Sequence, residues 1–244
     1  ARYSVDEISG EQVSPTFGAV WRPREGTALR ATASHGFRAP AINELYIYPS
    51  SNADLEAESA WNYEAGLRQR IPGGLLLDLA VFRMDGTDMI VLAGNPSPPP
   101  PVKFSNTGDF VFDGLEASLE GRWRAGLGGS VSYSYLDTGR WTQGRPGTKV
   151  DFELYAVRGT FTARLNGSHV SDYYGGDDAS DPIPSYTVVD LYGEGAVAGG
   201  LSVFLGIGNI GDEEYLIYTE LPGAAAGLYE MPGRSFTGGF RYAY

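Results

Sequence analysis

The sequence predicts an all-β fold, an antiparallel transmembrane β-barrel. Two observations support this prediction. Apolar and polar residues alternate with a period of two in segment after segment, as they do in strands whose two faces meet different surroundings. The connections between these segments also alternate in length, a short one following each long one, which is typical of membrane barrels.

Composition excludes several classes of protein. The 244 residues carry a formal net charge of −12, so no basic stripe is available for a nucleic-acid partner. The chain has no cysteine, which excludes a disulfide framework, a thiolate metal site and a cysteine nucleophile. Its apolar runs are only a few residues long, whereas a membrane-spanning helix needs about 20. A spanning strand needs only about 9–11 residues and tolerates polar residues at alternate positions.

The alternation is clearest between Leu127 and Tyr135, where leucine, valine and tyrosine alternate with glycine and serine. The same pattern recurs from Trp61 to Arg68, from Leu115 to Glu120, from Thr160 to Asn166, from Leu201 to Gly208 and from Ser235 to Tyr244. Because a sustained 3.6-residue period with caps is missing, we expect almost no helix.

About eleven strands are expected, at 14–22, 27–37, 61–70, 75–85, 110–122, 127–137, 149–157, 160–172, 185–196, 201–209 and 234–244. Their short connections are mostly rich in the glycine and proline that tight turns need, and fall at 23–26, 71–74, 123–126, 158–159 and 197–200. Their long connections fall at 38–60, 86–109, 138–148, 171–184 and 210–233.

The period of two alone fits either a soluble sandwich or a membrane barrel. A sandwich has no reason to separate short from long connections, whereas outer-membrane barrels have short periplasmic turns and long external loops. The expected strands are also mostly longer than the five or six residues common in globular sheets. We therefore expect the apolar face to meet outer-membrane lipid and the polar face to line a wet lumen.

The strand count indicates that residues 1–244 are one piece of a larger barrel. With a periplasmic C-terminus, an odd number of strands places residue 1 in an external loop, yet bacterial single-chain barrels have an even number. An isolated half would leave sheet edges that lipid cannot satisfy. The remaining half of the barrel is therefore an expected partner.

Several motifs, in order along the chain, resemble those of TonB-dependent outer-membrane receptors. Residues 36–46 read GFRAPAINELY, where a strand ends and a long connection begins, and residues 58–66 read ESAWNYEAG. Residues 114–119 (GLEASL), 133–138 (YSYLDT), 209–215 (NIGDEEY) and the final stretch 232–244 also look like the family.

This resemblance implies the C-terminal half of a 22-stranded plugged barrel, without its plug domain and N-terminal strands. It further implies uptake of a scarce nutrient in the bacterial outer membrane, most often a ferric siderophore and otherwise haem or cobalamin. Energy would come from the TonB complex acting through the plug. A passive porin or an adhesin-like barrel is the alternative, and a lipid hydrolase of the outer membrane is a further one.

Ligand-binding candidates are residues in or near the long connections. Aromatic rings there offer large contact area at low entropic cost, and an arginine could pair with an anionic ligand. The candidates are Arg38, Tyr46, Tyr48, Trp141, Tyr218 and Tyr229. The alternatives are an interfacial aromatic girdle for the rings and a loop-holding role for Arg38. The aromatic end of the chain, Phe240, Tyr242 and Tyr244, would serve as the barrel-assembly signal.

Catalysis, a metal and a cofactor are not expected. The histidines His35 and His169 do not form a cluster with metal-ligand spacing. Each follows a serine directly, so the two side chains of each pair point to opposite faces of a strand, the wrong geometry for a local hydrolase dyad. The acidic loop with Asp177, Asp178 and Asp181 could hold Ca²⁺, but a solvated acidic loop is the simpler interpretation.

Overall fold

The computed structural model describes residues 2–6, 10–93, 102–123, 126–219 and 227–242. Strands dominate these residues, and one short π-helix, η1 (Asn43–Ile47), lies in a long connection. Among the described residues we find no helix that is both long and apolar enough to span a membrane.

Eleven strands form one antiparallel sheet in the order β19-β16-β15-β12-β11-β10-β9-β6-β5-β4-β3. Each corresponds to one predicted strand, and the ends agree within three residues. Their bounds are β3 (Thr16–Arg24), β4 (Thr27–Arg38), β5 (Glu58–Ile71), β6 (Leu75–Thr87), β9 (Phe110–Arg122), β10 (Leu127–Asp137), β11 (Thr148–Arg158), β12 (Phe161–Ser171), β15 (Tyr186–Ala198), β16 (Leu201–Gly208) and β19 (Ser235–Tyr242). The predicted all-β fold and the alternating connections are confirmed.

Short hairpins that the sequence analysis did not predict also occur, three of them inside long connections. The four two-stranded sheets pair β1 (Arg2–Asp6) with β2 (Gly10–Ser14), β7 (Ile90–Ala93) with β8 (Lys103–Asn106), β13 (Tyr173–Tyr174) with β14 (Pro182–Ile183), and β17 (Leu216–Thr219) with β18 (Gly227–Glu230). These connections are therefore folded rather than extended.

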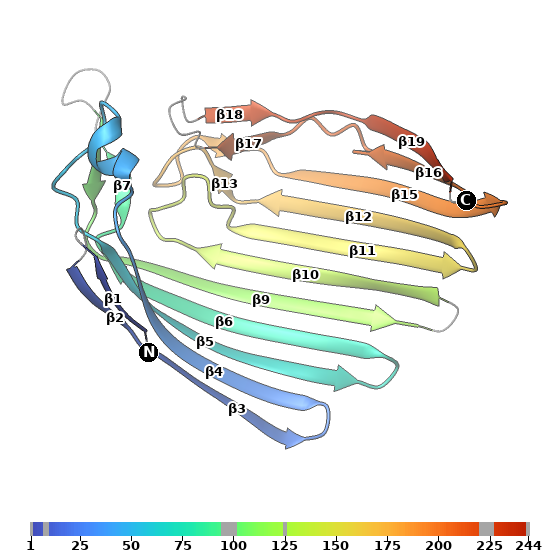
Figure 1. Ribbon diagram of the computed structural model, residues 1–244, viewed down its shortest axis with the longest axis horizontal. Helices are drawn as coiled ribbons and strands as arrows, with labels where there is room; N and C mark the ends of the chain where they lie inside the picture. The colour runs from blue at the N-terminus through green and yellow to red at the C-terminus, as the bar shows by residue number, and fades with distance from the viewer. Residues whose placement is uncertain (1, 7–9, 94–101, 124–125, 220–226, 243–244) are drawn as a thin grey trace. The chain divides into compact units, whose positions relative to one another are not determined.

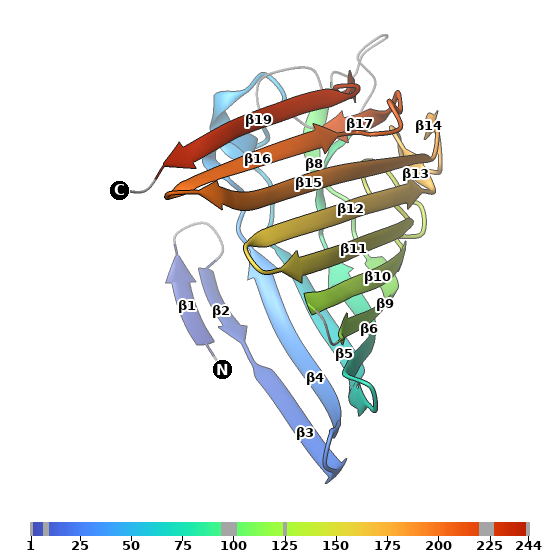
Figure 2. The same cartoon turned by 90° about the vertical axis from the view of Figure 1, so that its right-hand side faces the viewer.

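The chain divides into two compact units, which are described separately. The first contains residues 1–21, 29–66 and 81–113, and the second contains residues 22–28, 67–80 and 114–244. In the second unit, β10, β11, β12, β15 and β16 lie side by side (Figures 1 and 2).

The strand register of the second unit separates two faces. One row of directly paired residues runs Ser130, Glu153, Asn166 and Asp190 across four strands, and this face is polar. The next row, one residue along each strand, lies on the opposite face and runs Gly129, Leu154, Leu165, Leu191, Ile207 and Phe236. A one-residue slip would exchange the two faces, so the apolar pattern fixes this register.

The apolar face carries large side chains that are strongly exposed. Leu205 is 70% exposed, Phe236 75% and Phe240 76%, and none of the described large side chains is fully buried. Soluble proteins rarely expose apolar patches of this extent, since each such side chain gains about 1.5–3 kcal/mol when it leaves water. This is the face expected to meet lipid.

Aromatic rings on the apolar face cover glycines on the neighbouring strand. Phe152 is paired with Gly167, and Phe161 with Gly195, on the apolar face. A methyl group built on either glycine would overlap the opposing ring, so only glycine fits under each ring. The rings therefore pack against backbone and help to hold the register.

Candidate functional site

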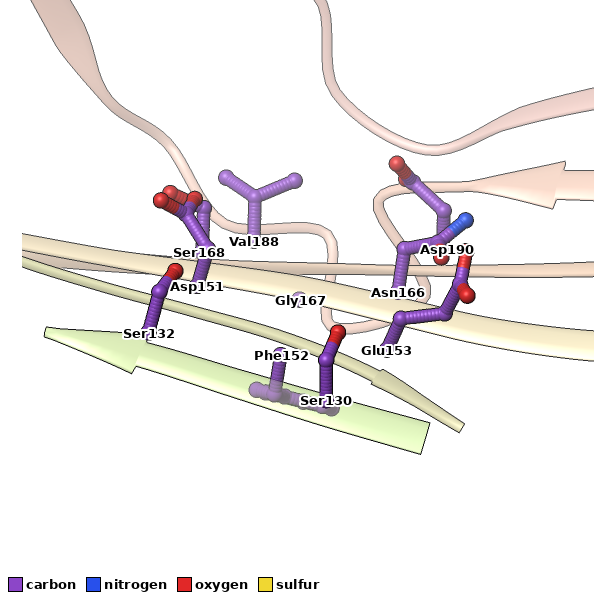
Figure 3. Close-up of a pocket in the computed structure, with 10 residues that line it drawn as sticks. All are labelled: Ser130, Ser132, Asp151, Phe152, Glu153, Asn166, Gly167, Ser168, Val188 and Asp190. Atoms are coloured by element: carbon purple, nitrogen blue, oxygen red, sulfur yellow. The ribbon is translucent and has the colours of Figure 1, made fainter. Parts of the chain in front are cut away.

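A polar hollow of about 330 Å³ lies on the polar face, over β10, β11, β12 and β15. Figure 3 shows the polar side chains pointing to one side of the sheet, whereas the Phe152 ring points to the other. The polar groups in its lining are Ser130, Ser132, Asp151, Glu153, Asn166, Ser168 and Asp190. In a barrel this surface would line the lumen.

Three carboxylates give this hollow a negative potential. Asp151 pairs with Lys149 at 3.1 Å, and Asp190 accepts a hydrogen bond from the backbone N–H of Asn209 at 2.7 Å. Hydroxyl and amide groups complete the lining, so the surface can exchange hydrogen bonds with a polar ligand or with another protein segment.

Ion pairs also connect neighbouring strands of the sheet. In the first unit Arg30 pairs with Glu64 at 2.9 Å, and in the second Arg68 pairs with Asp78 at 2.6 Å. Paired charges can face a wet lumen at little cost, because each is neutralised by its neighbour and still reaches water.

Arg38 lies at the end of β4, where the connection that contains η1 begins. Its guanidinium forms a bidentate pair with Glu58, at 2.8 and 2.9 Å, and also donates to both carboxylate oxygens of Glu44. The hydrogen bonds to Glu58 raise the pKa of Arg38; partial burial opposes this rise, and Glu44 adds to it. Arg38 therefore stays charged and ties η1 to the start of β5.

Glu58 connects this network to the next long connection. Its Oε1 also accepts a hydrogen bond from the backbone N–H of Ile90, at 2.6 Å. Behind it, Leu45, Leu55 and Ile90 form a small buried cluster with Phe104 packed against it. The GFRAPAINELY motif thus builds a rigid connection in which Arg38 is occupied by acidic side chains of the protein itself.

The two aromatic candidates in this connection differ in exposure. Tyr46 lies in η1 and is 68% exposed, whereas Tyr48, just after η1, is partly buried. Tyr46 is free to contact a ligand that reaches the connection, and its role in binding stays a prediction.

In the second unit, the connections at 138–147 and 172–185 are joined by hydrogen bonds. Thr142 donates through its hydroxyl to the Gly176 carbonyl, and its Oγ1 accepts from the Ala179 N–H. The Gln143 N–H donates to Asp177 at 3.1 Å, and Arg140 pairs with Asp178 at 3.0 Å. Two carboxylates of the acidic loop are thus bound by the neighbouring connection.

Further ligand-binding candidates lie in or near these two joined connections. Arg140 lies 5.2 Å from the ring of Trp141, a cation–π distance. The backbone N–H of Tyr218 donates to the hydroxyl of Tyr173, and the ring of Tyr218 contacts Gly144. Tyr229 lies on β18, beside Ile217 of the same hairpin. Trp141 and Tyr218 thus belong to connections that touch, while Arg38, Tyr46 and Tyr48 belong to the other unit.

The aromatic C-terminal strand lies at the edge of the sheet. Phe240 and Tyr242 are exposed on the apolar face of β19. Tyr244, the third member of the predicted assembly signal, lies outside the described residues.

The structural role of one buried residue was not predicted from the sequence. Asn209 is 5% exposed, has a positive φ of 51° and bonds through its side chain to both the N–H and the carbonyl of Glu213. The NIGDEEY motif contains it, but a role in a folded turn could have been inferred only from the tolerance of asparagine for positive φ.

The described residues also show how the possible metal ligands and the Ser168/His169 pair are arranged. Within the described ranges no group of three or more histidine, aspartate or glutamate side chains could hold a metal ion. Ser168 lines the polar hollow, whereas His169 belongs to the adjacent row of the register and donates to or accepts from Thr187 at 2.9 Å. The serine and histidine thus lie on opposite faces of β12.

Comparison with known proteins gives a family match. A family model described as "TonB dependent receptor-like, beta-barrel" matches residues 1–210. The vitamin B12 transporter BtuB of Vibrio vulnificus is 24% identical over 219 residues, which are 86% of this chain and 34% of that protein. BtuB of Photobacterium profundum is 30% identical over 210 residues, 77% of this chain and 32% of that protein. The chain thus spans about a third of the length of these relatives.

Solved structures share the fold. The siderophore receptor PirA from Pseudomonas aeruginosa aligns with a TM-score of 0.70 at 21% identity, over 96% of this chain and 40% of that one. The ferric enterobactin receptor PfeA aligns with a TM-score of 0.75 at 20% identity, over 98% and 41%. The copper transporter OprC aligns with a TM-score of 0.76 at 17% identity, over 95% and 39%.

Proposed function

Since this chain belongs to the TonB-dependent receptor β-barrel family, we propose that it is the C-terminal half of the β-barrel of an outer-membrane receptor that takes up a scarce nutrient. The observation that carries the proposal is the eleven-stranded sheet, which combines an exposed apolar face with short and long connections in alternation. The apolar face would contact outer-membrane lipid, and the long connections would lie outside the cell.

The other half of the barrel would complete the sheet at its two edges. Among the described residues, β3 and β19 each have one neighbour in the eleven-stranded sheet. Lipid offers no hydrogen bonds to an open strand edge, so further strands must pair with both in a membrane. Eleven more strands would give the 22-stranded barrel, with a plug in its lumen that couples the receptor to the TonB complex.

The proposed cargo is a ferric siderophore. The structural relatives PirA and PfeA are named as siderophore receptors, and exposed rings such as Tyr46 and Tyr229 suit capture of an aromatic chelate. The polar hollow with Ser130, Glu153 and Asn166 would then lie along the lumenal wall that faces cargo or plug.

Cobalamin is the second candidate. The sequence relatives from Vibrio vulnificus and Photobacterium profundum are both vitamin B12 transporters, and they cover most of this chain. Arg38 and Arg140 are both paired with carboxylates of the protein itself. This favours a cargo that can be recognised without a free cation.

Growth of a strain in which the gene is deleted tests the function. If the receptor takes up siderophores, deletion abolishes growth on a ferric siderophore as sole iron source, and a plasmid copy of the gene restores it. If it takes up cobalamin, the loss is seen in cobalamin-dependent growth instead. Uptake must also stop when TonB is removed. Uptake that continues without TonB would indicate a passive porin and contradict the proposal.

A further inference from the structure

A second hollow, of about 450 Å³, lies on the apolar face near the short turn between β11 and β12. Its apolar lining comes from four neighbouring strands, β11, β12, β15 and β16: Ala156, Phe161, Ala163, Gly193, Val203 and Leu205. Large exposed side chains, Phe161 and Leu205, stand beside small ones, Ala163 and Gly193, so the surface is hollowed rather than flat.

The floor of this hollow is open. A methyl group built on Gly193 would meet only the Thr162 carbonyl oxygen, at 3.9 Å. Gly195 differs, because the Phe161 ring already covers it. No other described atom lies within 4 Å of that methyl position, so the hollow is open above Gly193.

Among the described residues that line this hollow, one is a cation. Arg158 is the last residue of β11, is exposed and lines the hollow. It pairs directly with Phe161, so both side chains lie on the apolar face. Across the described part of the chain, Arg158 has neither an ion pair nor a side-chain hydrogen bond. Glu194 does not neutralise it, since its carboxylate points to the other face and accepts from the Tyr192 hydroxyl.

An unpaired arginine beside apolar surface suits a molecule with an anionic head and a hydrocarbon tail. The planar guanidinium donates two parallel hydrogen bonds to a phosphate, and the hollow excludes water from an acyl chain. Arg158 lies at the short-turn end, which faces the periplasm in the proposed orientation, at the depth of the phospholipid headgroups.

We propose that this hollow binds one phospholipid of the periplasmic leaflet, with its phosphate on Arg158 and one acyl chain over Ala163 and Gly193. The proposal rests on the membrane position of the sheet and not on the transport activity. Binding here would hold β11, β12, β15 and β16 in register at their periplasmic ends.

Native mass spectrometry of the purified full-length receptor tests this site. The receptor in detergent is titrated with phosphatidylglycerol or with a diacylglycerol of the same chains, which lacks the phosphate. We expect one preferred phosphatidylglycerol, and about tenfold weaker binding both of diacylglycerol and of phosphatidylglycerol to Arg158→Gln. Gly193→Leu should fill the hollow and reduce binding at least as much, and an unchanged Tm would show that the barrel is intact.

Arg241→Gln is the matched control, because Arg241 lies on β19 between Phe240 and Tyr242 and therefore faces the other side of the sheet. It should bind phosphatidylglycerol as the wild type does. Equal binding by wild type, Arg158→Gln and Gly193→Leu would overturn the proposal and indicate unspecific annular lipid. Cargo uptake by Arg158→Gln should be normal, so loss of the lipid site and failure of the transport proposal give different results.

Discussion

Individual acidic and basic residues hold the long connections in defined structures. Arg38 binds Glu44 and Glu58, and Glu58 also accepts the Ile90 N–H. The Glu44 and Glu58 side chains are 13% and 19% exposed, so these hydrogen bonds are partly shielded from water. Charge-assisted bonds in such surroundings are stronger than ordinary surface ion pairs.

Glu58→Gln should loosen this network without unfolding the sheet. The amide cannot form the bidentate pair with Arg38. We therefore expect the free energy of local opening around Ile90 to fall by about 1–3 kcal/mol. Hydrogen exchange of the Ile90 amide measures this directly. Asp54→Asn also removes one negative charge, from the connection that leads into β5 and at a side chain without a described partner, and should leave the exchange rate unchanged. Equal rates in Glu58→Gln and wild type would refute the role of Glu58.

In the last long connection, Asn209 has a similar role, because its side chain forms hydrogen bonds that hold the folded turn. Asn209→Ala removes both side-chain hydrogen bonds to Glu213 and leaves alanine at a positive φ. We expect a loss of about 2–4 kcal/mol in local stability, since unsatisfied backbone groups and left-handed alanine both cost energy. Asn209→Gly relieves only the backbone strain and should recover part of the loss. Hydrogen exchange at Glu213 distinguishes the two contributions, and similar protection in all three proteins would contradict this account.

At the scale of elements, aromatic–glycine pairs specify how neighbouring strands align. Phe152 lies over Gly167, which leaves no room for a methyl group there, whereas Gly193 has only the Thr162 oxygen at 3.9 Å. Gly167→Ala should therefore lower the free energy of unfolding by about 1–3 kcal/mol, and with it the Tm of the receptor. Gly193→Ala should leave both unchanged. Thermal unfolding of the two variants tests the pair. A Tm that falls equally in both would show that loss of glycine, and not ring contact, is responsible.

The eleven long strands could be predicted because their pattern repeats over many residues. From Leu127 to Tyr135 each large apolar residue faces one side, and no long-range information is needed to recognise this pattern. The hairpins β13–β14 and β17–β18 have only two to four residues per strand. They depend on contacts such as that between Tyr173 and Tyr218, 45 residues apart, which a local pattern does not encode.

The candidate site was predictable only in part, for the same reason. The sequence placed Arg38 at the start of a long connection, and in the structure it is the last residue of β4, directly before that connection. It left open whether the guanidinium meets a ligand or the protein, because Glu44 and Glu58 approach it only after the connection folds. The arrangement found in the structure favours the loop-holding role.

At the scale of the whole molecule, charge is distributed unevenly between the sheet and its long connections. The connections at 39–57, 88–109, 138–147, 172–185 and 209–234 contain 14 of the 30 acidic residues but only 4 of the 18 basic residues. This imbalance keeps the long connections in water and agrees with their proposed position outside the cell.

Site-directed labelling in intact cells tests the proposed orientation most directly, and the chain's lack of cysteine removes its own background. Ala179 is exposed in a long connection, and Thr160 is exposed in a short turn. A maleimide that cannot cross the outer membrane should label Ala179→Cys in intact cells, and Thr160→Cys only after the membrane is permeabilised. Labelling of Thr160→Cys in intact cells, or of neither position before permeabilisation, would contradict a sheet that crosses the outer membrane with its long connections outside.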